Sequence, residues 1–330
     1  MTTSTAQVVT AQSRPRYEGS NINTWIGFKH VMYVIEEAVL DFLRQSGRSP
    51  QELYESYGLG VDIVDSDARI LTALHIDDVT RTEVTQQPDD GSGELAFRTV
   101  TYVDRAGQNG AATVKAVTAK VRLVLRKAAD APETPADLAP ITVAEIRRGP
   151  AQSQPAGAGD SGATLVGRGV VGPADEVARA LGEGRNAVVW RWRIPYFYCH
   201  FNERIQHSGY LRIMEEVVDL FLAERGISIR TLLAGQRWIP VVPQARVEIL
   251  REALMEEELY TVFTVETVFK DLTYTAAMDC YVVRDGELLH TATGRITHGY
   301  AVTLDRHNWQ VVPFDAKTIA ALNNEQGGAV

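Results

Sequence analysis

The stretch NERIQHSGYLRIMEEVVDLFLAERGIS, residues 202–228, can be laid over NTWIGFKHVMYVIEEAVLDFLRQSGRS, residues 23–49, without a gap. Identical residues recur at a constant separation of 179 positions, as the glutamates show (216 − 37 = 179). Self-similarity of this kind indicates a duplicated structural unit. The identical pairs include Asn23/Asn202, Ile26/Ile205, Glu36/Glu215, Glu37/Glu216, Phe42/Phe221 and Gly47/Gly226.

The similarity extends beyond this stretch. Ala73-Leu74 matches Ala253-Leu254 at a separation of 180, which sets Asp77-Asp78 opposite Glu257-Glu258. Farther on, the separation returns to 179. The later pairs are Tyr102/Tyr281, Arg105/Arg284, Gly107/Gly286, Thr118/Thr297 and Leu125/Leu304. We therefore predict two copies of one unit.

Each copy opens with a helical pattern that strand-like segments follow. Apolar residues recur at helical spacing over 31–43 and 210–222, and Gly47 and Gly226 are placed to end these helices. The sequence Arg284-Asp285-Gly286 is typical of a hairpin turn. One long helix followed by antiparallel strands, twice, predicts an α+β sheet wrapped around a central helix. We predict strands at 245–252, 259–269, 273–284 and 287–304, and near 67–76, 79–86, 95–104 and 111–126.

The two copies define the domain organisation. We predict a first unit at 1–126, a flexible linker at 127–168 and a second unit at 169–330, with loose tails at 1–14 and 318–330. The linker is rich in Ala, Pro, Gly and Asp, a composition that buries too little apolar area to fold alone. The segment PADEVARALG, residues 173–182, is predicted to form a short helix.

Composition excludes several classes of protein. A net charge of −9 argues against a nucleic-acid partner, and no run approaches 18 apolar residues, so we expect no membrane span. The N-terminus lacks the pattern of a secretory leader. With only two cysteines and no CxxC pair, we predict a cytoplasmic protein without a disulfide framework. No histidine spacing indicates a metal site, and we expect no cofactor.

Three segments carry a resemblance to a known family. They are RYEGSN…EEA from Arg16 to Ala38, the N-x-x-…-Y-L-x-x-x-E helix start from Asn202 to Glu216, and GRITH from Gly294 to His298. They resemble the hot-dog fold, and two fused copies resemble the double-hot-dog acyl-ACP thioesterases of the 4-hydroxybenzoyl-CoA thioesterase-like superfamily. The resemblance covers most of both copies but not the linker.

The resemblance implies a fold, an activity and a substrate class. The fold is two tandem hot-dog units, each a long central helix wrapped by an antiparallel sheet. The substrate is an acyl chain carried as a thioester on an acyl carrier protein or coenzyme A, in fatty acid or polyketide metabolism. Fusion supplies the pairing that single-unit relatives obtain by dimerising, so the oligomeric state stays open, with a homodimer as one option.

The resemblance also implies a D-x-N-x-H run before the second helix. With Tyr210 as the anchor, His200 takes the Asp position, Asn202 the Asn position and Arg204 the His position, so Asn202 alone matches. A further catalytic cysteine or acid is implied around Ala253. The acids near that position are Glu252, Glu256 and Glu257.

His200, Asn202 and Arg204, which stand at the three motif positions, could still support acid–base catalysis. A strand over 188–198 would put four aromatic residues and Ile194 on one face with His200 in phase, if Pro195 does not break the alternation. Partial burial there would hold the imidazole neutral, as a general base requires. We predict His200 as base, Asn202 as orienting group and Arg204, with the helix N-terminus, as oxyanion stabiliser. Predicted substrate-binding residues are Glu203, His207, Tyr210, Tyr198 and Asn23.

Three functional interpretations stay open: thioester hydrolysis, dehydration or cyclisation of a carrier-bound acyl chain with histidine as base, and acyl binding without catalysis. A structural role competes for His200, which could be a satisfied polar residue, and for His207, which could flank the helix start. His30 and His75 have the counterparts Gly209 and Met255. Such asymmetry is typical of one working and one degenerate site, without saying which copy works.

Overall fold

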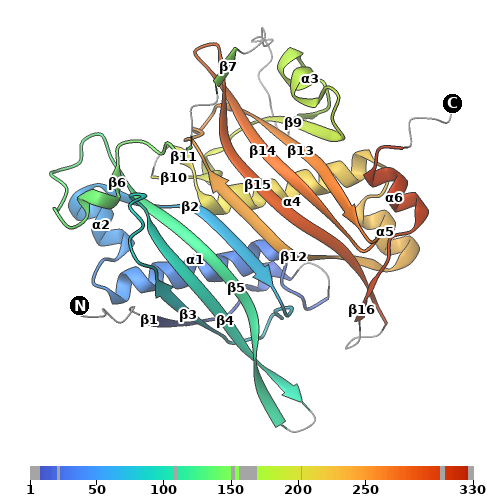
Figure 1. The fold of residues 1–330 in the computed structure, drawn as a ribbon, viewed down its shortest axis with the longest axis horizontal. Coiled ribbons are helices and arrows are strands. Elements are labelled where there is room, and N and C mark those ends of the chain that lie inside the picture. Colours follow the sequence, from blue (N-terminus) through green and yellow to red (C-terminus); the bar gives the residue numbers. More distant parts are fainter. Residues whose placement is uncertain are drawn as a thin grey trace. The chain divides into compact units, whose positions relative to one another are not determined.

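The structure, a computed structural model, describes residues 8–20, 23–107, 110–149, 153–155, 169–201, 203–304 and 309–325. The chain divides into two compact units, residues 1–146 and 147–330. In each unit one long helix lies against an antiparallel sheet (Figure 1). The predicted α+β architecture is therefore present in both copies.

The first unit contains the long helix α1 (Phe28–Gln45) and the short helix α2 (Pro50–Tyr57). Its antiparallel strands lie in the order β1-β3-β4-β5-β2, and β6 pairs parallel with β5. The rings of Phe42 on α1 and Phe97 on β4 lie 5.1 Å apart, so the helix packs on this sheet. The strands are β1 (Val8–Ser13), β2 (Leu59–Ile70), β3 (Thr80–Gln86), β4 (Leu95–Gly107), β5 (Gly110–Lys127) and β6 (Thr142–Val143).

The second unit contains the long helix α4 (His207–Glu224) and the shorter helices α3 (Glu176–Gly182), α5 (Ile229–Gln236) and α6 (Ala316–Leu322). Its main sheet has the order β12-β15-β14-β13-β9-β8, and β7 and β16 also pair with β15. The strands are β7 (Ser153–Pro155), β8 (Val170–Val171), β9 (Ala187–Arg193), β12 (Trp238–Ile249), β13 (Glu258–Phe269), β14 (Thr273–Arg284), β15 (Glu287–Thr303) and β16 (Trp309–Val312).

The duplication is visible element by element. Helices α1 and α4, helices α2 and α5, and strands β2 and β12 each begin and end 179 residues apart (207 − 28 = 179). Gly47 and Gly226 follow the long helices with φ of 74° and 69°, which confirms both predicted helix ends. The turn at Asp285-Gly286 joins β14 to β15 as predicted.

The separation does not change to 180 in the middle of the copies, as the Ala-Leu match suggested. Ile26 donates its N–H to the Leu74 carbonyl, and Ile205 donates to the Ala253 carbonyl, both at 2.9 Å. Leu74 is therefore equivalent to Ala253. A two-residue identity occurs easily by chance, whereas backbone pairing fixes the register, so His75 corresponds to Leu254 and not to Met255.

One ion pair recurs with the corrected register. In the first unit Arg105 donates to both oxygens of Asp78 and to the Ala73 carbonyl, while the His75 N–H donates to Asp78. In the second unit Arg284 binds Glu257 and the Glu252 carbonyl, and the Leu254 N–H donates to Glu257. In the first unit the ion pair thus ties the loop after β2 to β4. In the second unit it ties the loop after β12 to β14.

Two segments expected to be loose contain structure. Strand β1 lies within 1–14 and pairs with β3. Its alternate residues Val9 and Ala11 both point into the core. Helix α6 overlaps 318–330 and buries Leu322. The start of the predicted linker is also packed, since Leu138 is buried and β6 pairs with β5. Most of the linker from 150 to 168 lies outside the described residues.

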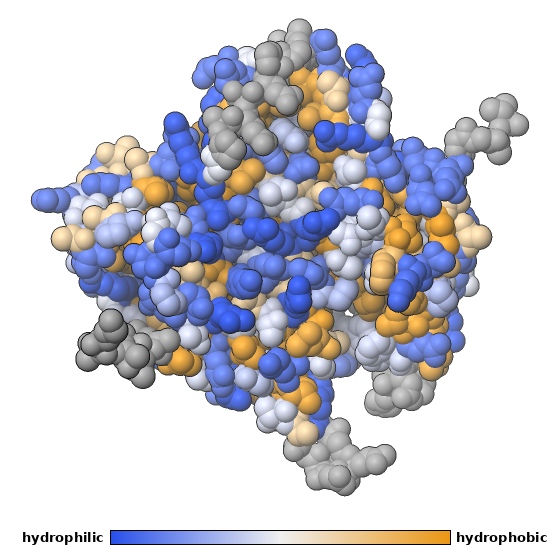
Figure 2. Space-filling model, viewed as in Figure 1, coloured by the Kyte–Doolittle hydropathy of each residue, from blue (hydrophilic) through white to orange (hydrophobic). Residues whose placement is uncertain are grey.

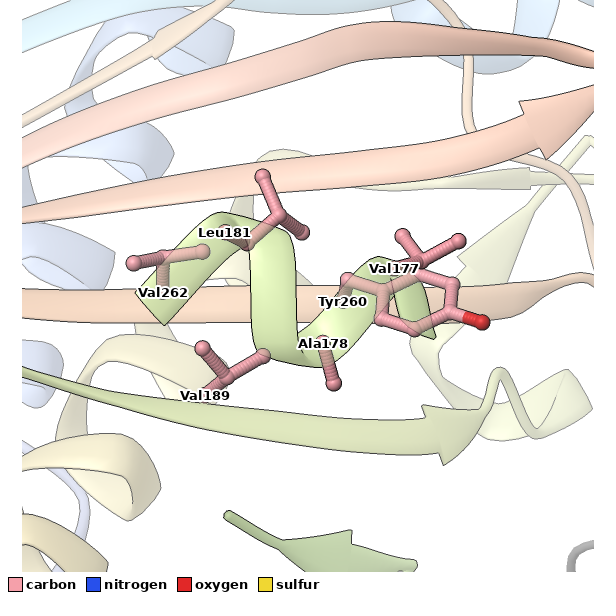
Figure 3. Close-up of a cluster of buried hydrophobic side chains, with 6 residues drawn as sticks. All are labelled: Val177, Ala178, Leu181, Val189, Tyr260 and Val262. Carbon is pink, nitrogen blue, oxygen red and sulfur yellow. The ribbon is translucent and has the colours of Figure 1, made fainter. Parts of the chain in front are cut away.

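Helix α3, which confirms the helix predicted within 173–182, covers the second unit's sheet on the face opposite α4. It packs on β9 and β13 through a buried apolar cluster (Figure 3). Because α4 contacts the same two strands, they are covered on both faces. The cluster consists of Val177, Ala178, Leu181, Val189, Tyr260 and Val262.

A buried polar network holds α3 in place. Asp175 caps the helix by accepting the Ala178 N–H at 2.7 Å, and its other oxygen accepts the Tyr260 hydroxyl at 2.8 Å. The same carboxylate lies 3.0 Å from the guanidinium of Arg191, which also binds Glu258. Buried charges need such partners, because each is costly to desolvate alone.

Hydrophilic residues prevail on the face shown in Figure 2. Among the described residues, no helix is long and apolar enough to cross a membrane.

An aromatic cluster lies at one end of the second unit's sheet. His298 stacks on Tyr274 with ring centroids 5.4 Å apart, and Phe314 contacts both Tyr274 and Tyr300. Trp238 stacks on Tyr300 at 5.6 Å. Burial lowers the pKa of His298 to about 4, because the apolar surroundings disfavour the charged imidazolium.

We expect Asp175→Ala to lower the free energy of unfolding by about 3 kcal/mol. The variant removes an acidic partner of the buried Arg191 guanidinium and also removes the N-cap of α3. Urea unfolding measures the loss. Glu266→Ala, which removes an exposed ion pair with Arg295, is the control and should cost less than about 1 kcal/mol. Equal losses in the two variants would contradict the role assigned to Asp175.

Acid should destabilise the protein through His298. The folded-state pKa lies below the ordinary value of 6.5, so the unfolded chain takes up the proton first as pH falls. The stabilising contribution is complete above pH 6.5 and is lost progressively toward pH 4, with a slope of at most about 1.4 kcal/mol per pH unit. Urea unfolding at pH 7 and at pH 5 gives the loss of free energy of unfolding on acidification. This loss should be smaller in His298→Gln than in the unchanged protein.

Candidate functional site

Two of the predicted catalytic residues, His200 and Arg204, lie on a small hairpin directly before α4. Strands β10 (Cys199–His200) and β11 (Arg204–Ile205) pair antiparallel, and His200 is the direct partner of Arg204. Directly opposed residues of an antiparallel pair project to the same side with their Cβ atoms about 5 Å apart. The hairpin therefore brings the predicted base and the predicted oxyanion stabiliser together.

The long strand predicted to lead into His200 is interrupted. Strand β9 ends at Arg193, and after Pro195 the chain makes a 3-10 turn, η3 (Tyr196–Tyr198). Proline fixes φ and lacks an N–H, so it ends the ladder here. Trp190 and Trp192 are buried and stacked 4.7 Å apart as expected, but Tyr196 is 74% exposed. His200 therefore does not continue the aromatic face of β9.

Backbone hydrogen bonds fix the hairpin on both sides. The Ile205 N–H donates to the Ala253 carbonyl, and the Met255 N–H donates to the Glu203 carbonyl at 2.6 Å. The Gln206 N–H donates to the Tyr198 carbonyl at 3.1 Å. The hairpin is thus held between the turn η3 and the loop that follows β12.

Arg204 and His200 both contact Phe201 at the hairpin's turn. The guanidinium of Arg204 lies 5.3 Å from the centre of the Phe201 ring, and the His200 ring lies 4.6 Å from it. Arg204 is only 4% exposed, whereas His200 is half-buried. Phe201 has φ of 44°, an uncommon value for a bulky residue. A cation over an aromatic ring is stabilised by the ring's quadrupole.

The first turn of α4 follows at once. His207 is its first residue and is buried, and the helix N-terminus carries the partial positive charge of the aligned peptide dipoles. Tyr210 is fully buried, and burial raises the pKa of its hydroxyl well above the ordinary value. Arg212, which sequence reasoning did not single out, lies 5.9 Å from the ring of the buried Tyr198.

The three glutamates near the expected acid position have different surroundings. Glu257 is engaged by Arg284, and Glu256 by Arg193. Glu252 is buried and directly precedes Ala253, whose carbonyl binds the hairpin. Burial next to the hairpin singles out Glu252, a distinction that sequence spacing alone does not make.

Asn202 lies outside the described residues. Its equivalent, Asn23, is exposed in the first unit with φ of 58°, a left-handed conformation that asparagine tolerates better than most residues. Of the predicted residues, the structure places His200, Glu203, Arg204 and His207 on or beside one hairpin. Among the described residues, no group of histidine, cysteine or acidic side chains is arranged to hold a metal ion.

The first unit carries different chemistry at the equivalent place. The Thr24 hydroxyl lies 2.8 Å from Nδ1 of His75, and Nε2 of His30 lies 3.3 Å from Glu18. Burial and the nearby Arg105 lower the pKa of His75. The two copies thus share a backbone frame and differ in their polar side chains.

The copies also exchange a large and a small residue across one contact. In the first unit a Cβ on Gly19 would lie 2.7 Å from His30 on the helix. In the second unit the turn carries Tyr198 and the helix carries Gly209, whose added Cβ would meet the Tyr198 carbonyl at 2.8 Å. Since 198 − 19 and 209 − 30 both equal 179, the turn and the helix approach closely at the same place in both units, and a glycine on one side permits the approach in each.

Comparison with known families finds a match, which lies in the second unit. Residues 189–322, which include the hairpin, α4 and the strands that follow, match the thioesterase-like superfamily. The resemblance drawn from the sequence is therefore confirmed. No curated protein sequence matches the chain.

Solved structures share the fold along most of the chain. A protein described as an oleoyl thioesterase from Lactobacillus plantarum is 12% identical with a TM-score of 0.55, and the match covers 90% of this chain and 97% of that one. The 12:0-ACP thioesterase from Umbellularia californica is 11% identical, with a TM-score of 0.55 and coverage of 89% and 94%. An acyl-ACP thioesterase from Bacteroides thetaiotaomicron is 9% identical, with a TM-score of 0.52 and coverage of 88% and 97%. The fold of two tandem hot-dog units is thus confirmed.

Gly209→Ala should destabilise the second unit, because the new methyl group would press on the Tyr198 carbonyl and on Ile205. We expect a loss of about 1 to 3 kcal/mol in urea unfolding, as for other overpacked sites. Gly235→Ala is a matched control in α5, where an added Cβ meets nothing within 4 Å, and should be neutral or stabilising. If both variants gain stability, the close contact at Gly209 is not a constraint.

Proposed function

We propose that the protein is an acyl thioesterase that hydrolyses an acyl chain from an acyl carrier protein or coenzyme A. The match of residues 189–322 to the thioesterase-like superfamily supports the reaction class. The observation that carries the proposal is the pairing of His200 with Arg204 on a hairpin fixed at the start of α4. This pairing sets a proton acceptor beside a buried cation.

The proposed reaction uses His200 as general base. Its imidazole takes a proton from water, and the oxygen attacks the thioester carbonyl carbon. The carbonyl oxygen becomes an oxyanion, which Arg204 and the N-terminus of α4 stabilise. When the C–S bond breaks, the thiolate leaves and takes the proton from the imidazolium. The products are a carboxylic acid and a free thiol.

The remaining predicted residues are proposed to hold the substrate or the water. Asn202 would orient the water or the carbonyl, and the buried Glu252 would position the hairpin or accept a hydrogen bond from the water. Glu203, His207, Tyr210 and Tyr198 are proposed to contact the substrate in the second unit. Asn23 is proposed to do so in the first.

Hydrolysis is favoured over dehydration or cyclisation, because the matching superfamily is one of thioesterases. A role in fatty acid or polyketide metabolism, a cytoplasmic location and a homodimer are parts of the proposal. The cytoplasmic location is supported by Cys199 and Cys280, which are both free thiols. The two-unit organisation, with 169–330 as the catalytic half, belongs to the same proposal.

His200→Ala should lower kcat by about 10² to 10⁴, the usual contribution of a general base. Release of free thiol from acyl-CoA and acyl-ACP substrates measures the rate, and mass spectrometry of the products separates hydrolysis from dehydration. The control is His290→Ala, which removes a histidine paired with Asp279 outside the hairpin and should keep most activity.

A third variant decides between the copies. His75→Ala removes the histidine that the first unit holds beside Thr24, and it should leave kcat within about threefold of the unchanged protein. Loss of turnover in His75→Ala with full turnover in His200→Ala would assign the base to the first unit and refute the proposed site.

A further inference from the structure

The aromatic cluster of the second unit lies on the helix-facing side of the sheet. A Cβ on Gly294 would run into Met214 of α4, so residue 294 faces this helix. Side chains alternate along a strand, and the pairing of β15 with β14 is regular between 294 and 299, so His298 points to the same side. Tyr274 is its direct partner on β14. The cluster therefore continues the surface on which α4 packs.

Three buried polar atoms of this cluster lack a hydrogen-bond partner. They are the hydroxyls of Tyr274 and Tyr300 and the Nδ1 atom of His298, and all three side chains are at least nine-tenths buried. The two hydroxyls lie near each other and affect each other's pKa, but the geometry between them is not that of a normal hydrogen bond. Proteins satisfy most buried polar atoms, and each orphan is costly. Three orphans within one ring-stacked cluster indicate a place where a polar group from outside completes the hydrogen bonds.

Two flexible side chains lie against Gly294 on this face of the sheet. The methyl groups of Met214 and Met278 both point at the position where Gly294 has no side chain. Methionine is unbranched and adopts new rotamers more easily than the branched residues around it. The glycine thus leaves a space that two movable side chains occupy.

The spacing along the sheet suits a long linear chain. Burial, and to a lesser extent the nearby Cys280, raise the pKa of Tyr210 in the first turn of α4, and Cys280 pairs with Ala292 on β15. From Ala292 to His298 is six residues, or about 20 Å at the rise of a strand. A chain that enters beside the first turn of α4 therefore reaches the cluster only if it is extended.

We propose that the second unit binds an extended acyl chain between α4 and β14–β15, and that Tyr274, Tyr300 and His298 bind a hydroxyl or keto group at the remote end of this chain. The inference rests on the proposed thioesterase function and adds the substrate class. Two phenol hydroxyls can each donate or accept, and the neutral His298 adds a ring nitrogen, so this set suits a neutral polar group. A carboxylate would be desolvated here without a cation.

The test compares two substrates that differ only at the remote end, hexadecanoyl-CoA and ω-hydroxyhexadecanoyl-CoA. We expect kcat/KM to favour the ω-hydroxy substrate by about tenfold or more, because a site built to bind a hydroxyl rejects the analogue that lacks it. Tyr274→Phe and Tyr300→Phe should reduce this preference toward unity. Each variant should change thermal stability little, since neither hydroxyl makes a hydrogen bond of normal geometry.

The matched control is Tyr281→Phe, which changes a tyrosine on the same strand that packs against the α3 cluster instead. It should keep the full preference. Equal kcat/KM for both substrates in the unchanged protein, or a preference that survives both cluster variants, would overturn the inference.

Calorimetric binding of the free acids, hexadecanoate and ω-hydroxyhexadecanoate, separates this inference from the proposed function. If no thioester is hydrolysed but the hydroxy acid binds at least tenfold tighter and Tyr274→Phe abolishes the difference, the hydrolase proposal fails and the polar pocket stands. If thioesters are hydrolysed and both acids bind equally, the pocket is refuted and the hydrolase proposal stands.

Discussion

The ion pair between Arg284 and Glu257 is the constraint on which the candidate site depends. It holds the loop after β12, since Arg284 also binds the Glu252 carbonyl and Glu257 accepts the Leu254 N–H. That loop in turn accepts and donates the backbone hydrogen bonds of the β10–β11 hairpin. The position of His200 beside Arg204 thus follows from an interaction two steps away. The equivalent ion pair in the first unit joins Arg105 and Asp78, so this interaction is part of the duplicated unit.

A common frame with different side chains explains how one fold supports two halves of unequal chemistry. The first unit presents hydroxyl, imidazole and carboxylate groups at Thr24, His75 and Glu18, whereas the second presents His200 and the buried Arg204. Backbone hydrogen bonds set the frame and do not depend on side chains. The side chains at the hairpin were therefore free to diverge after duplication, while the ion pair that fixes the loop was not.

Much of the fold could be predicted from the sequence, because the helical and strand periodicities are strong and occur twice. The long helices, their glycine ends and the β14–β15 turn follow from local patterns. The alternation from Trp190 to His200 depended on Pro195, which locally ends the strand. Other predictions failed where long-range contacts decide, since β1 and α6 owe their order to pairing and packing that composition does not reveal. At the candidate site, the resemblance pointed to His200 and Arg204 and to three nearby glutamates, and only the fold distinguishes Glu252 among these three by its burial.

The exchange between Gly19 with His30 and Tyr198 with Gly209 has a consequence for how the two halves evolve. A side chain added at Gly19 would overlap His30, and one added at Gly209 would overlap the Tyr198 carbonyl, so neither glycine accepts the larger residue found at the equivalent position of the other half. Recombination that joined a turn carrying tyrosine at position 19 to the helix carrying His30 would set two large side chains against each other. This contact therefore opposes exchange of the turn alone between the two copies.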